Sequence, residues 1–433
     1  MKKKVLSLLL AGLMTAGTLA GCGSEESTDS GDDVQKVTIL CHASWRNDGN
    51  QAAFEYVEEK LNVQLEFEEV PEGDSGEQLI FAKITNGESP DILWWQGAST
   101  ANVKMGADLF ENLSDIRDWG ADYDTEALAT KIYTIDDRQI VAPFGDATVF
   151  GMCYNKQIFE ENNIEIPTTW EEFESACETL KAAGVIPMYL SGKDAWTLQI
   201  IGLDAYGKEY AGDSSLVEEM DTHQKTFSDM DIMKGALNEM VTLVEKGYVQ
   251  ETFLSDTYVD AQTALLDGTC AMYPMASYIQ PELAKIADEA ELENLGMFAI
   301  PGTDGQQIAT VSTPSGFYVP SDGENIELAK EVVAELSSKE AAEAMYGVQS
   351  GIPFIQGVDG NAIGILKDAS DIMNNDEIVK PVGPADLTKY QKGPLETYIQ
   401  DMLVGNRTAD EVLQSLDDDF AKQANDAGDE NWQ

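Results

Sequence analysis

Several aromatic and polar residues lie where the sequence predicts loops at the ends of apolar strands. The candidates are Trp45, Asn47, Asp48, Trp196 and Phe317. Aromatic rings can stack on the apolar C–H faces of a sugar, while carboxylate and amide groups can bind its hydroxyl groups. These residue types therefore indicate noncovalent binding of a hydroxyl-rich molecule. Each ring could instead pack in a hydrophobic core.

The sequence offers little of the chemistry that an enzyme needs. It contains no G-x-S-x-G, H-E-x-x-H or C-x-x-C motif, and His42 and His223 are its two histidines. Residues 202–208 approach the spacing of a phosphate-binding loop, but Glu209 stands where such a loop requires Ser or Thr. We therefore predict a protein that is not an enzyme and uses no cofactor or metal. Paired carboxylates could still hydrolyse glycosides, so an extracellular glycoside hydrolase remains an alternative.

The net charge argues against several classes of partner. The chain carries 78 acidic and 27 basic residues, for a formal charge of −51 at pH 7. Such a surface repels a phosphate backbone, so we predict no nucleic-acid partner. Arginines are scarce, whereas sites for phosphate or for several carboxylates use arginine forks. A neutral ligand is favoured, although one arginine would suffice for a carboxylate, so a receptor for peptides or amino acids also remains open.

The elements that would position these residues belong to an α/β lobe. The pattern predicts a strand over residues 37–41, a helix over residues 50–61 and a strand over residues 63–70. This order is a β-α-β unit. Ligands of such sheets bind beyond the carboxyl ends of the strands, which places residues 45–48 at a cleft.

A crossing between two lobes is predicted near the middle of the first half. At 433 residues the chain exceeds one ordinary hydrophobic core, so two lobes are expected. Residues 139–142 and 149–154 predict short strands joined by a polar link without a helix. Such a link favours a passage from one lobe to the other, where a hinge would lie. Beyond it, Thr169 is placed as the N-cap of a helix over residues 170–183.

The same stretch resembles a known family. It is similar to the crossover of the extracellular solute-binding proteins of ABC importers, the group that includes maltose-binding protein. The matching residues are Asp137, Pro143, Tyr154, Asn155, Lys156, Phe159, Pro167, Thr169, Trp170 and Glu172. Gly268-Thr269-Cys270-Ala271-Met272 resembles the strand that precedes a second crossing in the family. The resemblance extends over almost the whole chain after the N-terminal segment.

The resemblance implies an α/β fold of two lobes, of the type II periplasmic-binding-protein kind. Each lobe would be a mixed sheet flanked by helices, with a hinge between the lobes. The first lobe would contain residues 36–145 and 279–345. The second lobe would contain residues 146–278 and 346–433.

The resemblance also implies three further ligand-binding residues. Trp95 stands where the family carries a sugar-contacting tryptophan, and Tyr278 stands where another such ring is expected. Asp146 lies just beyond the first crossing strand, where relatives often place a hydroxyl acceptor. The alternatives are that Trp94, beside Trp95, is the exposed ring and that Asp146 is an acid of a surface turn.

The first residues indicate export and a lipid anchor. A basic start precedes an apolar run that ends in small residues directly before Cys22, as in a bacterial lipoprotein. We expect a signal peptide over residues 1–21, lipidation of Cys22 and a flexible linker over residues 22–35. The alternative is an ordinary secretory signal with a chance cysteine. The protein would then lie at the extracellular face of the cytoplasmic membrane, held there by lipid alone.

The other cysteines show no spacing typical of a disulfide framework. They are Cys41, Cys153, Cys177 and Cys270. An extracellular location permits disulfides, so the sequence leaves their pairing open. Buried free thiols are the favoured interpretation for Cys41 and Cys153, which lie in apolar runs.

These features together predict the lipid-anchored substrate-binding component of an ABC importer. It would capture a carbohydrate, such as an oligosaccharide, in the cleft between its lobes. It would then deliver the ligand to the transmembrane subunits of a permease. We expect a monomer.

Overall fold

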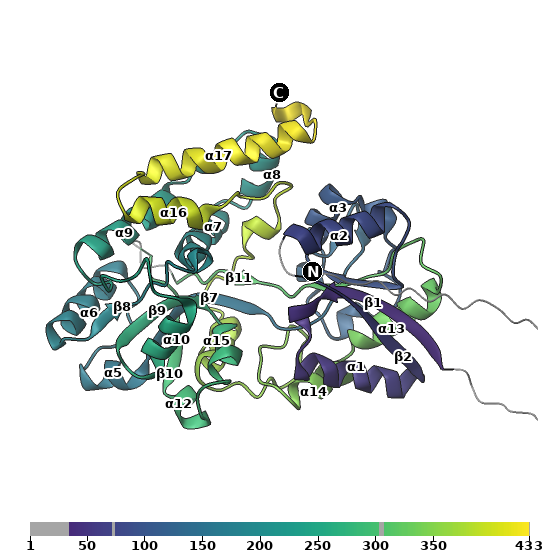
Figure 1. Ribbon diagram of the computed structural model, residues 1–433, viewed down its shortest axis with the longest axis horizontal. Helices are drawn as coiled ribbons and strands as arrows, with labels where there is room; N and C mark the ends of the chain where they lie inside the picture. Colours follow the sequence, from purple (N-terminus) through teal and green to yellow (C-terminus); the bar gives the residue numbers. More distant parts are fainter. Residues whose placement is uncertain (1–33, 72–73, 303–306, 433) are drawn as a thin grey trace, which may run out of the picture. The chain divides into compact units, whose positions relative to one another are not determined.

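In the described part of the chain, two five-stranded β-sheets form the centres of two lobes (Figure 1). The computed structural model describes residues 34–71, 74–302 and 307–432. Both sheets belong to one compact unit, Gln35–Gln433. The predicted signal peptide, Cys22 and the linker as far as residue 33 lie outside the described residues.

The first sheet is built around an apolar parallel strand. Its strands, in spatial order, are β2 (Val63–Val70), β1 (Gln35–His42), β3 (Ile92–Trp95), β12 (Gly316–Tyr318) and β6 (Ala142–Pro143). β1 pairs in parallel with β2 and β3, whereas β12 pairs antiparallel with β3 and β6. Val37, Ile39, Leu40 and Cys41 are fully buried, because a central parallel strand is covered on both faces.

Among the described residues, six α-helices accompany the first sheet and complete the first lobe. They are α1 (Asp48–Leu61), α2 (Asp74–Thr85), α3 (Ala98–Lys104), α4 (Thr125–Leu128), α13 (Ile326–Leu336) and α14 (Lys339–Tyr346). A short hairpin of β4 (Thr134–Ile135) and β5 (Arg138–Gln139) lies in the same part of the chain. The helices bury Phe54, Val332 and Tyr346 in one core with the strands.

The second sheet is mixed, and helices cover both of its faces (Figure 1). Its strands, in order, are β10 (Leu295–Phe298), β7 (Thr148–Asn155), β9 (Cys270–Ala276) and β8 (Ile186–Met188), and β11 (Val311–Ser312) pairs with the start of β7. On one face Met152 and Met272 pack in one core cluster, and on the other Cys153 and Tyr273 pack in another. Alternate residues of a strand point to opposite faces, so β7 and β9 contribute to both cores.

Eleven α-helices of the described residues belong with the second sheet and make up the second lobe. They are α5 (Lys156–Glu161), α6 (Trp170–Ala183), α7 (Ile200–Gly212), α8 (Leu216–Asp221), α9 (Asp231–Glu245), α10 (Tyr258–Leu266), α11 (Ile279–Leu283), α12 (Glu289–Glu293), α15 (Gly364–Asn374), α16 (Leu395–Leu403) and α17 (Ala409–Asp426). Helices therefore flank a mixed sheet in each lobe. This is the two-lobed α/β fold that the sequence predicts.

Within the described residues, three segments of the chain connect the two lobes. Residues 144–147 join β6 to β7, as the pattern of strand, polar link and strand predicts. Residues 313–315 join β11 to β12, and residues 347–363 join α14 to α15. The first and third segments are bonded to each other, because the Ala147 N–H donates to the Ile352 carbonyl at 2.9 Å.

The boundary of the lobes differs from the expectation at one place. Residues 279–312 were expected in the first lobe, yet α11, α12, β10 and β11 lie with the second sheet. β10 pairs antiparallel with β7 from Leu295 opposite Asn155 to Phe298 opposite Met152. The chain therefore returns to the first lobe at residues 313–315 and not directly after β9. The apolar run of residues 295–298 fits an edge position in either sheet, so its pattern gives no sign of its partner.

Candidate functional site

An exposed aromatic cluster lies at the carboxyl ends of two neighbouring strands. β8 and β9 are parallel, so the chain leaves both at the same edge of the second sheet. Trp196 follows β8 and lies 5.0 Å from Tyr258 and 6.4 Å from Tyr278 between ring centroids. Tyr278 follows β9. Trp196 is 38% exposed and Tyr278 is 40% exposed, so both rings are accessible to a ligand.

Hydrogen bonds fix the loop that carries Trp196. The Ser191 hydroxyl lies 2.7 Å from the Tyr273 hydroxyl and 2.9 Å from the Thr197 hydroxyl. The Asp194 carboxylate accepts a hydrogen bond from the Tyr258 N–H at 2.7 Å. Because these bonds join the loop to the sheet and to α10, they restrict the positions that the indole can take. Such pre-organisation reduces the entropy lost when a ligand binds.

A cavity of about 600 Å³ lies between the first lobe and helix α7 of the second. The first lobe contributes Gln96, directly after β3. Helix α7 and the residue before it contribute Gln199, Leu203 and Tyr206, and the loop before α16 contributes Gln391 and Lys392. This volume falls within the range of small-molecule sites.

The polar groups of this cavity are mostly uncharged. Four glutamines line it, namely Gln96, Gln199, Gln391 and Gln423, together with the hydroxyl residues Tyr206, Thr310 and Ser312. Among the described residues that line it there is no Asp or Glu, and Lys392 is the one cation. The Lys392 ammonium lies 3.8 Å from the Glu396 carboxylate, which partly balances its charge. A carboxamide both donates and accepts, as a sugar hydroxyl does.

A smaller hollow of about 250 Å³ shares Gln96 and Ser312 with this cavity. It is lined by the start of α3 and by residues 313–315, the segment that joins β11 to β12. The two hollows therefore lie along the passage between the lobes. A ligand longer than one sugar ring has room there.

The residues predicted near the start of the chain lie at the end of β1. Trp45 is half-buried, with its ring 5.3 Å from that of Trp94. Asn47 is exposed and caps α1, because its side chain accepts a hydrogen bond from the Asn50 N–H at 2.8 Å. Asp48 is exposed in the first turn of α1. These side chains do not line the large cavity.

Trp95 and Phe317 pack in the core of the first lobe, the alternative that the sequence left open. Both side chains are fully buried, on the neighbouring strands β3 and β12. The Trp95 ring lies 5.3 Å from Phe81, and its indole N–H has no hydrogen-bond partner among the described residues. Trp94 is not the exposed ring either, because it is 3% exposed and its indole N–H donates to the Ser315 hydroxyl at 3.2 Å.

Asp146 lies in the segment that joins β6 to β7, but its carboxylate is engaged within the protein. It accepts hydrogen bonds from the Tyr346 hydroxyl at 2.9 Å and from the Ile352 N–H at 2.8 Å. Burial raises the pKa of this carboxyl to about 6, although the two hydrogen bonds act in the opposite direction. In this arrangement the carboxylate connects two of the crossing segments.

The sequence interpretation missed the glutamines that line the cavity. Gln96 directly follows β3, so the rule that ligands bind beyond the carboxyl ends of strands would have selected it. Gln199 lies one helical turn after Trp196. Gln391 and Gln423 come from the last part of the chain, and no local pattern connects them with the cavity.

Metal ligands and thiols are the remaining groups that could do chemistry in the part of the chain that the structure describes. In that part no group of three or more His, Cys, Asp or Glu side chains could hold a metal ion. The four described cysteines are buried free thiols, as favoured for Cys41 and Cys153. Burial raises the pKa of the Cys41 thiol to about 12.

Among the described helices, none is both long enough and apolar enough to cross a membrane.

Comparison with known proteins adds a family and two structural relatives. The family model described as Bacterial extracellular solute-binding protein matches residues 43–343, more than half of the chain. The Multiple sugar-binding protein of Streptococcus mutans is 23% identical over 376 residues, which cover 82% of this chain and 83% of that protein.

Solved structures agree in fold. A chitin oligosaccharide binding protein superposes with a TM-score of 0.73 at 19% identity, covering 92% of this chain and 100% of that chain. The structure of SBP RafE in complex with raffinose gives a TM-score of 0.67 at 19% identity, covering 90% and 99%. The matching motifs, the two-lobed fold and the family model lead to one conclusion: this chain belongs to the bacterial extracellular solute-binding proteins.

Proposed function

We propose that this protein captures a carbohydrate between its lobes and delivers it to the membrane permease of an ABC importer. The observation that carries the proposal is the cavity lined by carboxamides and hydroxyls, without a carboxylate among its described residues. Trp196 and Tyr278 are not among the residues that line this cavity, but their exposed rings would offer a stacking surface to a sugar that extends beyond it. Such a set of groups suits a neutral, hydroxyl-rich ligand.

The named relatives support this class of ligand. One is called a multiple sugar-binding protein, and related structures are those of a chitin oligosaccharide binding protein and of a protein in complex with raffinose. An oligosaccharide is our preferred ligand, because the two adjoining hollows together offer more room than a single sugar ring fills. Trp45, Asn47 and Asp48 remain proposed contacts for a ligand that extends toward the end of β1.

The proposed mechanism is closure and not a reaction. A ligand that contacts Gln96 in the first lobe and Gln199 in the second bridges the lobes. It stabilises the closed form only through contacts that the open form cannot make. The three connecting segments would bend as the hinge, and the permease would recognise the closed form.

Binding measurements test the proposal directly. Isothermal titration calorimetry with neutral di- to tetrasaccharides should identify at least one ligand. Gln199→Leu should weaken its binding, because the ligand then loses a carboxamide partner. Gln157→Leu is the matched control, since Gln157 is exposed on α5 and does not line the cavity.

Two other outcomes would favour other functions. Binding of peptides or amino acids without binding of any sugar would favour a peptide receptor of the same fold. Release of shorter glycans, followed by chromatography, would favour the hydrolase alternative.

We further propose that Cys22 is lipidated and holds the protein, as a monomer, at the extracellular face of the cytoplasmic membrane. The support is the basic, apolar and small-residue order that precedes Cys22. Cys22→Ser should move the protein from the membrane fraction to the medium. An unchanged distribution between the two fractions would contradict the anchor.

A further inference from the structure

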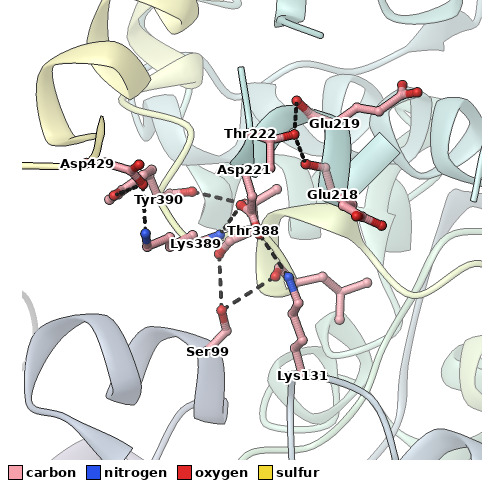
Figure 2. Close-up of polar contacts among 11 residues, drawn as sticks. Ser99, Lys131, Glu218, Glu219, Asp221, Thr222, Thr388, Lys389, Tyr390 and Asp429 are labelled. Carbon is pink, nitrogen blue, oxygen red and sulfur yellow. Dashed lines mark hydrogen bonds and ion pairs between the residues drawn. The ribbon is translucent and has the colours of Figure 1, made fainter. Parts of the chain in front are cut away.

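The two lobes also touch each other beside the cavity, through a group of polar residues (Figure 2). Ser99, at the start of α3, and Lys131 belong to the first lobe. Asp221, at the end of α8, and the loop of residues 387–390 belong to the second lobe. The contact does not involve the three connecting segments, so it forms only in an arrangement that brings the two lobes together.

An ion pair is the centre of this contact. The Lys131 ammonium lies 2.8 Å from one carboxylate oxygen of Asp221. The other oxygen accepts a hydrogen bond from the Lys389 N–H at 2.7 Å. The Asp221 side chain is only 13% exposed, which limits its screening by solvent and salt. The buried Ser99 hydroxyl adds longer hydrogen bonds of 3.5 and 3.4 Å to the carbonyls of Leu387 and Thr388.

Each half of the contact is held firmly by its own lobe. In the first lobe, the Ser99 N–H donates to the Lys131 carbonyl at 2.8 Å, so the two residues move together. In the second lobe, the Asp429 carboxylate lies 2.7 Å from the Lys389 ammonium and accepts a hydrogen bond from the Tyr390 hydroxyl at 2.8 Å (Figure 2). The loop that meets the first lobe is thereby tied to the end of the chain.

Apolar contacts accompany the ion pair. Val217 of α8 and Leu387 are buried in the same core cluster as the residues of the first sheet. Tyr210 packs against the clusters of both lobes. The lobes therefore share an apolar interface that accompanies the ion pair.

We propose that Lys131 and Asp221, with Ser99, form a latch that sets the affinity for ligand without touching it. None of the three is among the described residues that line the cavity. They act through the equilibrium between open and closed forms. The measured dissociation constant is the intrinsic one divided by the fraction of protein in the binding-competent form. The latch raises that fraction, so it lowers the measured dissociation constant of every ligand by the same factor. This inference rests on the proposed function.

The test compares Lys131→Met with a matched variant, Lys36→Met. Lys36 lies 2.5 Å from Glu66, and this exposed ion pair joins β1 to β2 within the first lobe. Both variants lose one positive charge, but only the first changes a contact between lobes. Calorimetry with several carbohydrates that bind the wild type should give dissociation constants about three- to tenfold higher for Lys131→Met, by one common factor. Lys36→Met should leave them unchanged.

Small-angle X-ray scattering of the ligand-free protein gives a second readout. Lys131→Met and Asp221→Asn should each increase the radius of gyration, whereas Lys36→Met should not. A Lys131→Met variant that binds every sugar as the wild type does would overturn the latch. So would a loss confined to one sugar, because Lys131 would then contact that ligand. Failure of the wild type to bind any carbohydrate would instead overturn the proposed function, and scattering would still decide whether the latch exists.

Discussion

Exposure separates Trp196 and Tyr278 from the other rings that the sequence singles out. Trp95 and Phe317 lie on adjacent central strands, where a large ring is needed to fill the space between sheet and helices. Trp196 and Tyr278 lie beyond the ends of β8 and β9 and stay partly exposed, although the Trp196 ring lies 5.0 Å from that of Tyr258 at the start of α10. A sequence shows that an aromatic ring lies in or near the end of a strand, but it does not show how deeply that ring is buried.

Trp196→Ala should weaken carbohydrate binding while leaving stability nearly unchanged. Loss of a stacking ring costs about 1.5 kcal/mol, which corresponds to a dissociation constant about tenfold higher. Because the side chain is partly exposed, we expect the melting temperature to fall by less than about 2 °C. Calorimetry and thermal unfolding provide the two measurements.

Trp196→Phe is the control for this substitution, because it keeps a ring at the same position. It should recover most of the affinity. A large fall in melting temperature for Trp196→Ala would show that the ring supports the fold. Equal affinities for the Ala and Phe variants would show that the ring does not contact the sugar.

The Asp146 carboxyl provides a prediction about pH. Burial raises its pKa to about 6 from an ordinary value of about 3.9, so the folded protein holds this proton more tightly than the unfolded chain does. The stabilisation is fully present below about pH 4 and is lost as pH rises through 6. Asp146→Asn keeps a neutral group at every pH. Relative to the wild type, its free energy of unfolding should therefore increase by up to about 3 kcal/mol between pH 4 and pH 7.

Urea unfolding at several pH values measures this difference. Asp108→Asn serves as the control, because the Asp108 side chain is fully exposed. The control should show no such trend. A constant difference between Asp146→Asn and the wild type from pH 4 to pH 7 would contradict a buried carboxylate at this crossing.

Elements with local signals could be predicted from the sequence, and elements with distant partners could not. Helix α6 covers residues 170–183 as expected, and Thr169 and Glu172 form the reciprocal cap at its start. The cap depends only on residues three positions apart. By contrast, the place of β10 depends on pairing with β7, more than a hundred residues earlier. The apolar pattern of a run of four residues does not identify the strand with which it pairs.

Helix α7 explains why residues 202–208 resemble a phosphate-binding loop without being one. The Lys208 ammonium lies 2.7 Å from the Asp204 carboxylate, and both side chains are almost fully buried. Lys208 also donates to the Ile300 carbonyl at 2.6 Å, and the Thr310 N–H donates to Asp204 at 3.2 Å. The lysine therefore joins α7 to the segments around it and is not available for a phosphate.

Lys208→Met should consequently destabilise the protein strongly. It leaves the Asp204 carboxylate buried without its ionic partner, which costs about 3–5 kcal/mol. The matched control is Lys367→Met, which removes an ion pair of the same spacing with Asp371, where both side chains are exposed. Urea unfolding should detect a large loss for the first variant and none for the second. Equal effects would mean that the pair in α7 contributes no more than a surface pair.

At the scale of the whole molecule, the cavity combines segments that are distant in the sequence. Gln96 comes from the first lobe, Gln199 from the second, and Gln391 from the loop before α16. The resemblance to a family predicts that a cleft exists between the lobes. Only the folded chain shows that carboxamides line it. Those residues meet because α7 and α16 both pack against α9 and against the short helix of residues 195–199.

The contrast between a strongly acidic molecule and a nearly uncharged cavity leads to a prediction about salt. The chain has a net charge of −51, and this self-repulsion destabilises the folded state at low ionic strength. Raising NaCl from about 20 mM to about 500 mM shortens the screening length from about 20 Å to about 4 Å. We therefore expect the melting temperature to rise.

The affinity for a neutral sugar should change by less than about threefold between the two salt concentrations. The described residues that line the cavity include no carboxylate, and the charge of Lys392 is partly balanced by that of Glu396. Part of any remaining dependence should come from the Lys131–Asp221 pair, so the dependence should be smaller in Lys131→Met. Calorimetry with the neutral sugar at the two salt concentrations decides the point: a change of affinity well above threefold would contradict a cavity in which uncharged groups make the contacts with the ligand.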